Sequence, residues 1–170
     1  MNPFVDLQKR SIDLPEGCKD LFDALQTTRS QSDSRSRYKL VKSLQEAERF
    51  LAGLLLTPTH LTYISIDVPR QQHHLQICPA LDALCIAFRI DGGDKGRLQR
   101  IRKLFRDTGI SSIDDSFGGI ANHTPFRVLI YPLPGIAPDA AQLIARVLRY
   151  GFAVPEKSKL YFSYNEQAVA

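Results

Sequence analysis

Apolar side chains in the second half of the chain follow two patterns that alternate along the sequence. Short runs rich in β-branched and aromatic residues predict strands, and longer segments with apolar residues at every third or fourth position predict amphipathic helices. The strands are expected at 84–90, around 110–117, at 126–132 and at 159–164, and the helices at 96–109 and 138–151. This order is that of a ferredoxin-like βαββαβ sandwich, a fold of the α+β class.

Each predicted strand should have an apolar face and a mixed face, because successive side chains point to opposite sides. The apolar faces would pack on the two helices, and Gly109 and Gly151 stand where a residue with positive φ would end each helix. Leu129 is assigned to the mixed face. If the strand registers align, that face also gathers Arg89, Arg127, Tyr131 and Tyr161.

The first half of the chain predicts an arm and a helix. Residues 1–37 are expected to form an irregular arm with a short helix and then a mobile linker rich in serine and arginine. The linker, residues 27–37, contains no apolar side chain that would offset the entropy cost of ordering it. From residue 38 to 56, leucines and alanine recur at helical spacing, which predicts one amphipathic helix with Leu40 on its buried face.

Residues 60–68 then alternate in polarity, which predicts a strand buried on the side of Ile64 and Ile66. Residues 73–78 follow a turn and are expected to return as its hairpin partner. The extra elements would extend the sheet or cover its second face. We therefore divide the chain into the arm and linker (1–37), a helix and hairpin extension packed on the main domain (38–83), and the ferredoxin-like module (84–170).

Composition points to the cellular compartment. The chain of 170 residues is 44% hydrophobic and 24% charged, as in ordinary globular proteins. Its net charge of +4 permits an anionic partner without requiring one. Cys18, Cys78 and Cys85 are odd in number and widely spaced, which is typical of a reducing compartment and not of a disulfide framework. Since we find no signal peptide and no membrane-spanning run, we expect a cytoplasmic protein without a membrane partner.

The glycine-rich segment 91–97, DGGDKGR, is the first candidate site. It lies between a predicted strand and a predicted helix, where glycines allow a ligand close to the backbone and the helix N-terminus attracts an anion. Its spacing matches neither a dinucleotide-binding loop nor a P-loop. A flexible turn with Asp94 at the helix start is an equally good interpretation.

Residues 86–113, which contain this loop, resemble the opening of an ACT domain, a small amino-acid-sensing module of metabolic enzymes. Gly96 and Leu98 match the Gly-x-Leu of that family, and Gly109 matches the glycine before its second strand. Lys95 replaces the usual proline, and serines stand near the expected asparagine. The resemblance covers roughly residues 84–164. It implies an amino-acid-like effector at a subunit interface, bound by Gly93, Asp94, Gly96, Leu98, Ser111 and Ser112.

Nucleic acid is the alternative ligand. The predicted helix at 96–109 is strongly basic, and a cationic stripe can follow phosphates. However, the helix has no interleaved aromatic residues, and the strand at 126–132 lacks the signature of RNA-recognition modules. A solvated helix face is therefore the simpler interpretation. The residues assigned to this alternative are Arg89, Arg127, Tyr131, Tyr161, Arg100 and Lys103.

We identify no catalytic residue, no metal ligand set and no cofactor site. Asp114 and Asp115 should point to opposite sides if they lie on a strand, which disfavours a paired-carboxylate site there. The leading hypothesis is a non-enzymatic regulatory or small-molecule-binding domain. It is expected to form a homo-oligomer through its sheet edges or its mixed face.

Overall fold

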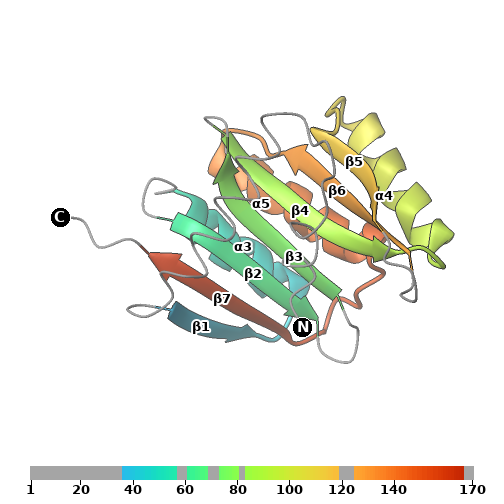
Figure 1. Ribbon diagram of the computed structural model, residues 1–170. Coiled ribbons are helices and arrows are strands. Elements are labelled where there is room, and N and C mark those ends of the chain that lie inside the picture. The colour runs from blue at the N-terminus through green and yellow to red at the C-terminus, as the bar shows by residue number, and fades with distance from the viewer. Residues whose placement is uncertain (1–35, 57–60, 69–72, 81–82, 119–124, 167–170) are drawn as a thin grey trace.

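The computed structural model describes residues 36–56, 61–68, 73–80, 83–118 and 125–166 (Figure 1). The predicted arm, short helix and most of the predicted linker lie outside these residues. Ser36 and Arg37, the last two residues of the linker, belong to a strand. The elements are β1 (Ser36–Val41), α3 (Leu44–Leu55), β2 (Leu61–Val68), β3 (His73–Ala80), β4 (Ala83–Asp91), α4 (Lys95–Asp107), β5 (Asp114–Gly118), β6 (Phe126–Pro132), α5 (Ala137–Arg146), a π-helical turn (Val147–Gly151) and β7 (Leu160–Glu166).

The described strands form one antiparallel sheet of seven strands, in the order β1-β7-β2-β3-β4-β6-β5. Its three described helices cover one face (Figure 1). Leu44 of α3, Phe105 of α4 and Ile144 of α5 are buried in the same hydrophobic core as Phe88 of β4. We call the opposite side of the sheet, on which no described helix lies, the helix-free face.

This architecture confirms the α+β class, with more strands than a simple βαββαβ module. β4, β6 and β5 are neighbours in the sheet, and α4 connects β4 to β5. β7 does not pair with β4, because the hairpin of β2 and β3 lies between them. Ile64 of β2 is opposite Tyr164 of β7, and Leu75 of β3 is opposite Phe88 of β4. The predicted extension therefore supplies β2 and β3 to the interior of the same sheet, while α3 packs on it.

The predicted helix over residues 38–56 was wrong at its start. Its first residues belong to β1, so Leu40 lies on a strand and is 39% exposed. The helix begins after Ser43, whose Oγ accepts the backbone N–H of Glu46 at 3.1 Å. The Glu46 carboxylate accepts the backbone N–H of Lys42 at 2.8 Å. These two bonds satisfy amide groups at the helix start and fix the boundary there.

The predicted hairpin is confirmed. β2 and β3 pair antiparallel, and the side chains of Ile64, Ile66 and Val68 are buried as expected. β7 also has the predicted alternation, because Phe162 is buried and its neighbour Tyr161 is 49% exposed. Regular alternation therefore predicted these strand faces correctly.

The predicted faces of β6 were wrong. Leu129 lies opposite Phe88, so Leu129 and Tyr131 face the helices and are buried. Tyr131 stacks on Phe105 of α4, with ring centres 3.7 Å apart. Neither residue belongs to an open mixed face. The error arises because β6 is apolar and buried on both sides, so its side-chain alternation does not indicate which side meets the helices.

The π-helical turn after α5 packs closely on α4. A Cβ at Gly151 would lie 2.8 Å from Cγ1 of Ile101, so only glycine fits this approach without a shift. Arg100 of α4 donates from Nε to the carbonyl of Tyr150 at 3.0 Å and from Nη2 to the carbonyl of Gly151 at 3.2 Å. The position of α4 is thereby tied to the end of α5.

The two glycines predicted to end helices differ. Gly109 follows α4 and has a φ of 73°, as predicted. Gly151 does not have a positive φ, and the feature that this position requires is the lack of a Cβ beside Ile101. The positive φ occurs two residues later, at Ala153, where φ is 54°. The prediction for Gly151 was therefore wrong, because close packing and not backbone conformation requires glycine there.

Candidate nucleic-acid interface

The glycine-rich loop between β4 and α4 is occupied by its own side chains. The Asp94 carboxylate accepts the backbone N–H of Arg97 at 3.0 Å and pairs with its guanidinium at 3.1 Å. Gly92 donates its N–H to the carbonyl of Pro125 at 2.6 Å, and a Cβ on Gly92 would meet the same oxygen. The first turn of α4 therefore already has an anionic partner, and the need for Gly92 is explained by packing.

The predicted effector residues do not gather within one chain. Gly93 is exposed, with nothing near the position of a Cβ, and Leu98 packs against the core. Gly96 is also exposed, close to the first turn of α4. Ser111 and Ser112 are exposed beyond the other end of this helix, whose 13 residues span about 20 Å. An effector that touched both groups would need two chains.

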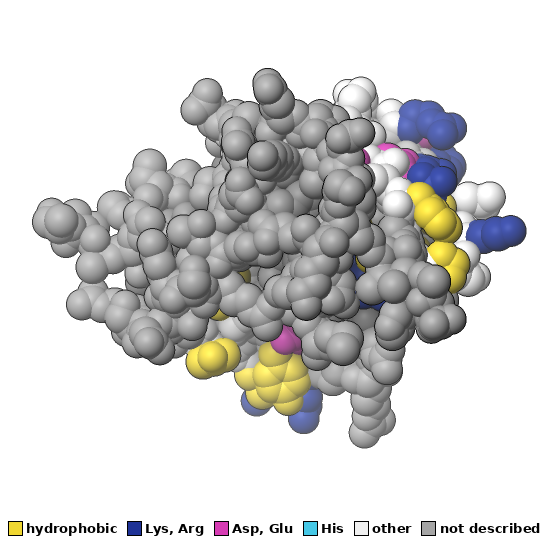
Figure 2. Space-filling model, viewed as in Figure 1, with side chains coloured by type: hydrophobic (Ala, Val, Ile, Leu, Met, Phe, Trp, Pro, Cys, Tyr) yellow, Lys and Arg dark blue, Asp and Glu magenta, His cyan; other side chains and the backbone are white. Residues whose placement is uncertain are grey.

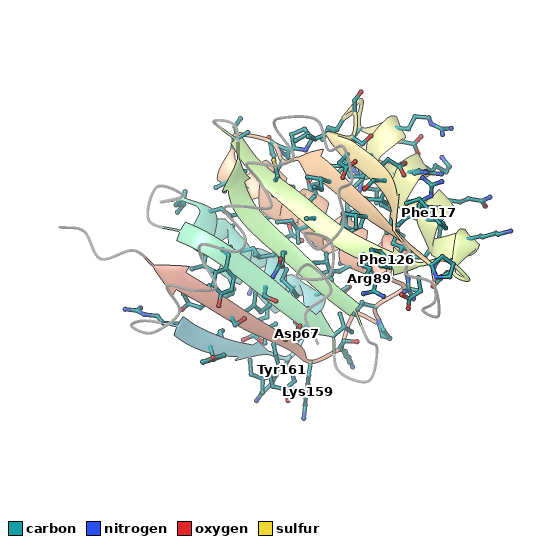
Figure 3. All side chains as sticks on the ribbon, in the orientation of Figure 1. Asp67, Arg89, Phe117, Phe126, Lys159 and Tyr161 are labelled. Atoms are coloured by element: carbon teal, nitrogen blue, oxygen red, sulfur yellow. The ribbon has the colours of Figure 1, made fainter. Side chains whose placement is uncertain are left out.

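The residues of the nucleic-acid alternative do not form one sheet face either. Tyr131 is buried on the helix side, where burial raises the pKa of its hydroxyl. Arg127 also lies on the helix side. Arg89 lies on the helix-free face, with its guanidinium carbon 4.0 Å from the ring centre of Phe126 (Figure 3). Tyr161 is four strands away from β6, near the opposite edge of the sheet. The prediction that these four side chains share a face was therefore wrong.

Several basic side chains of α4 have structural partners. Arg100 binds two backbone carbonyls, as described above, and Lys103 pairs with Asp107 at 2.7 Å. Arg102 donates from Nε to Oδ2 of Asp115 at 2.8 Å. The carboxylate of Asp115 is shared, because its Oδ1 accepts from Nη1 of Arg127 at 2.8 Å. One carboxylate on β5 thus holds two arginines, one from α4 and one from β6, and leaves their charges only half neutralised.

Phe117 is the aromatic residue beside this cluster. It lies on β5, the last strand in the described sheet, and 60% of its surface is exposed. Its strand position is opposite Arg127, whose guanidinium carbon lies 5.7 Å from the centre of the phenyl ring. Figure 3 shows Phe117 at the side of the sheet next to α4. An exposed ring can stack on a planar ligand, and a guanidinium beside the ring can bind a negatively charged group of the same ligand.

Sequence reasoning missed Phe117 because the residue is distant in sequence from the basic helix. Its partner Arg127 was found, but the register that joins them is set by strand pairing. One signal was present in the sequence: a phenylalanine in the polar segment DDSFG has no apolar neighbours that would bury it. We call the surface formed by Lys95, Arg102, Lys103, Arg106, Phe117 and Arg127 the basic edge.

Positive charge is concentrated around the basic edge. Its five basic side chains have two acidic partners, Asp107 and Asp115, which leaves a surplus of three charges. The basic residues are Lys95, Arg102, Lys103, Arg106 and Arg127. In Figure 2, Lys and Arg side chains gather beside exposed hydrophobic atoms at this end of the molecule.

Titratable groups elsewhere do not assemble into a reactive site in the described residues. Burial raises the pKa of the Cys85 thiol to about 11, so it is protonated at neutral pH and a poor nucleophile. Burial also raises the pKa of Asp114, which accepts a hydrogen bond from Ser116 at 3.0 Å. Asp114 and Asp115 diverge as predicted. Among the described residues, no group of three His, Cys, Asp or Glu side chains is arranged to hold a metal ion.

Comparisons with protein-family models, with curated proteins and with solved structures found no match for this chain. Within the described residues, every helix is too short or too polar to cross a lipid bilayer. The assignment of an interface therefore depends on the charge and geometry of the basic edge.

Proposed function

We propose that the protein is a non-enzymatic nucleic-acid-binding protein that takes up single-stranded nucleic acid along the basic edge. The observation that carries this proposal is the exposed ring of Phe117 beside the guanidinium of Arg127, within a surface that has a surplus of positive charge. Cations supply the sequence-independent attraction to phosphates. The aromatic ring supplies stacking, which every base can use.

A single strand fits this surface better than a duplex. Bases in a duplex are stacked on each other, so their faces do not reach an exposed phenyl ring. Phe117 lies on a short edge strand of five residues, and the cations around it extend along the neighbouring helix. A flexible strand can place one base on Phe117 and its flanking phosphates near Lys95, Lys103 or Arg106.

The small-molecule hypothesis receives less support. Its anion site at the start of α4 is filled by Asp94, and the distance between Gly96 and Ser111 requires a second chain. The same positive charge disfavours a symmetric dimer through the basic edge, because two cationic surfaces would face each other. Self-association and a cytoplasmic location stay predictions. Leu129 and Tyr131, which were expected on the mixed face, are buried on the helix side and so do not form an oligomer interface there.

We interpret the fold itself as a ferredoxin-like unit enlarged by an inserted hairpin. β4, α4, β5, β6, α5 and β7 follow the chain order of that unit, and β2 and β3 separate its first strand from its last. Because each inserted strand is antiparallel to its neighbours, two added strands preserve the relative direction of β4 and β7. This interpretation explains why the chain order suggests a smaller sheet than the one that forms.

The proposal is tested by fluorescence anisotropy with a labelled oligothymidylate and a labelled duplex of the same length. We expect the single strand to bind more tightly at low salt. The slope of log affinity against log salt concentration should be about −2 to −4, as for three to five phosphate contacts. Absence of oligothymidylate binding at low salt would contradict the proposal, and so would a clear preference for the duplex.

A further inference from the structure

A second exposed surface lies at the opposite edge of the sheet from the basic edge. β1 is the first strand of the described sheet and pairs with β7 along one side. Tyr38 is 79% exposed, Leu40 is 39% exposed and Tyr161 of β7 is 49% exposed. We call these three residues the β1 patch. It is separate from the residues proposed to bind nucleic acid.

The strand register makes the β1 patch continuous. Leu40 lies opposite Tyr161, and Tyr38 lies two residues away on the same side of β1. Val41 and Leu160, the next residues along the two strands, are buried in the helix-side core. The patch therefore faces away from the helices. Figure 2 shows hydrophobic atoms grouped at this edge, with Lys and Arg side chains beside them.

Basic residues alternate with the patch along β1 and lie at its end. Lys39 is exposed between Tyr38 and Leu40, and it points to the helix side of the sheet. Lys42 and Lys159 are exposed directly beyond the last pair of β1 and β7 (Figure 3 labels Lys159 and Tyr161). An added strand would thus meet apolar side chains on one face and Lys39 on the other.

A second copy of β1 is a poor partner for this edge. In a symmetric dimer, two copies of β1 would pair antiparallel about a two-fold axis. Directly opposed residues must lie on the same side of the sheet, so the axis has to pass through a residue position and not between two residues. If the axis passes through Tyr38, Arg37 is opposite Lys39 of the other copy. If it passes through Lys39, the two Lys39 side chains are opposite each other. Like charges in directly opposed positions are destabilising. An axis through Leu40 avoids them but pairs only residues 39–41 of the two strands, so β1 favours a different strand.

We propose that the outer edge of β1 takes up an extended segment of another protein in which acidic and apolar residues alternate. Apolar residues of that segment would pack on Tyr38, Leu40 and the neighbouring Tyr161. Its acidic residues would lie opposite Lys39 on the helix side, because side chains alternate with a period of two. Main-chain hydrogen bonds to the edge strand supply affinity, and the two faces supply specificity.

The test uses a fluorescein-labelled peptide of alternating glutamate and valine, and a control peptide of the same composition with the glutamates and valines in separate blocks. We expect the alternating peptide to bind and the control to bind much less. Lys39→Glu should weaken binding about five- to tenfold, as expected when favourable cross-strand pairs become repulsive. Tyr38→Ser should weaken it as well, and Phe117→Ala at the basic edge should leave it unchanged.

Hydrogen exchange locates the binding. The alternating peptide should slow exchange of β1 amides and leave β5 amides unchanged. Equal binding of both peptides, or no effect of Lys39→Glu in a variant with an unchanged melting temperature, would overturn the proposal. A dimer that light scattering detects and that Tyr38→Ser dissociates would also overturn it, since the occupant would then be a second copy. Because these readouts use peptides and β1 variants, their failure is distinguishable from failure of the nucleic-acid proposal.

Discussion

The guanidinium carbon of Arg127 lies 5.7 Å from the ring centre of Phe117, while Nη1 of Arg127 donates to Oδ1 of Asp115 at 2.8 Å. The same carboxylate holds Arg102 of α4. Three elements that are separate in sequence therefore meet beside one exposed ring. The carboxylate fixes the direction of both guanidinium groups before any ligand arrives, which reduces the entropy cost of binding.

The shared carboxylate should matter more for stability than an exposed ion pair on the same helix. Asp115→Asn removes the anionic partner of two half-buried arginines, and we expect the free energy of unfolding to fall by about 1–3 kcal/mol. Asp107→Asn is the matched control, because its pair with Lys103 is exposed and should contribute less than about 1 kcal/mol. Urea denaturation of both variants measures the difference. Equal losses would contradict the structural role given to Asp115.

Two glycine substitutions should have opposite effects. Gly151→Ala places a Cβ 2.8 Å from Cγ1 of Ile101, and overpacking of this kind costs about 1–3 kcal/mol. Gly53→Ala is the control, because nothing lies within 4 Å of its Cβ position in α3. There, replacement of a helical glycine should stabilise by roughly 0.5–1 kcal/mol. Thermal unfolding of both variants is the measurement, and a stabilised Gly151→Ala would contradict the close packing of α4 on the turn.

Asp114 should destabilise the folded protein at neutral pH. Burial raises the pKa of its carboxyl above the ordinary value of aspartate, so the folded protein holds that proton more tightly than the unfolded chain. Stability contributed by this group is therefore lost as the pH rises from the unfolded pKa through the folded one.

We expect Asp114→Asn to raise the melting temperature at pH 7. This gain should shrink as the pH falls through the raised pKa of the folded state, and it should be absent below about 4, where the carboxyl is protonated in both states. Melting curves of the wild type and the variant over that pH range provide the measurement. A gain that is independent of pH would show that packing, and not the charge, is responsible.

The sequence predicted most elements of the fold because their local signals are strong. The hairpin of β2 and β3 and the buried side of β7 follow from regular alternation. The start of α3 was missed although it is encoded locally, since Ser43 and Glu46 form a capping pattern that limits the helix. The place of the hairpin in the sheet was not predictable, because strand order depends on pairing between distant segments.

The candidate site depends even more on distant pairing. Alternation assigned Leu129 and Tyr131 to an open face, because both sides of β6 are apolar and only its register with β4 decides which side meets the helices. The basic character of α4 was readable from sequence. Phe117 joined that surface only through its pairing with Arg127, 10 residues further along the chain.

In the proposed complex, Phe117 stacks on a base of the bound single strand. The most direct test is the affinity of Phe117→Ala for a labelled oligothymidylate at low salt, with Tyr161→Ala as the control. Tyr161 is also an exposed aromatic residue, but it lies near the opposite edge of the sheet.

We predict that Phe117→Ala weakens binding about 5- to 100-fold, the range expected for loss of one base–aromatic stack. Phe117→Trp should retain binding, and Tyr161→Ala should bind as the wild type does. Binding by Phe117→Ala that equals the wild type, or an equal loss in Tyr161→Ala, would contradict the proposed stacking of a base on Phe117.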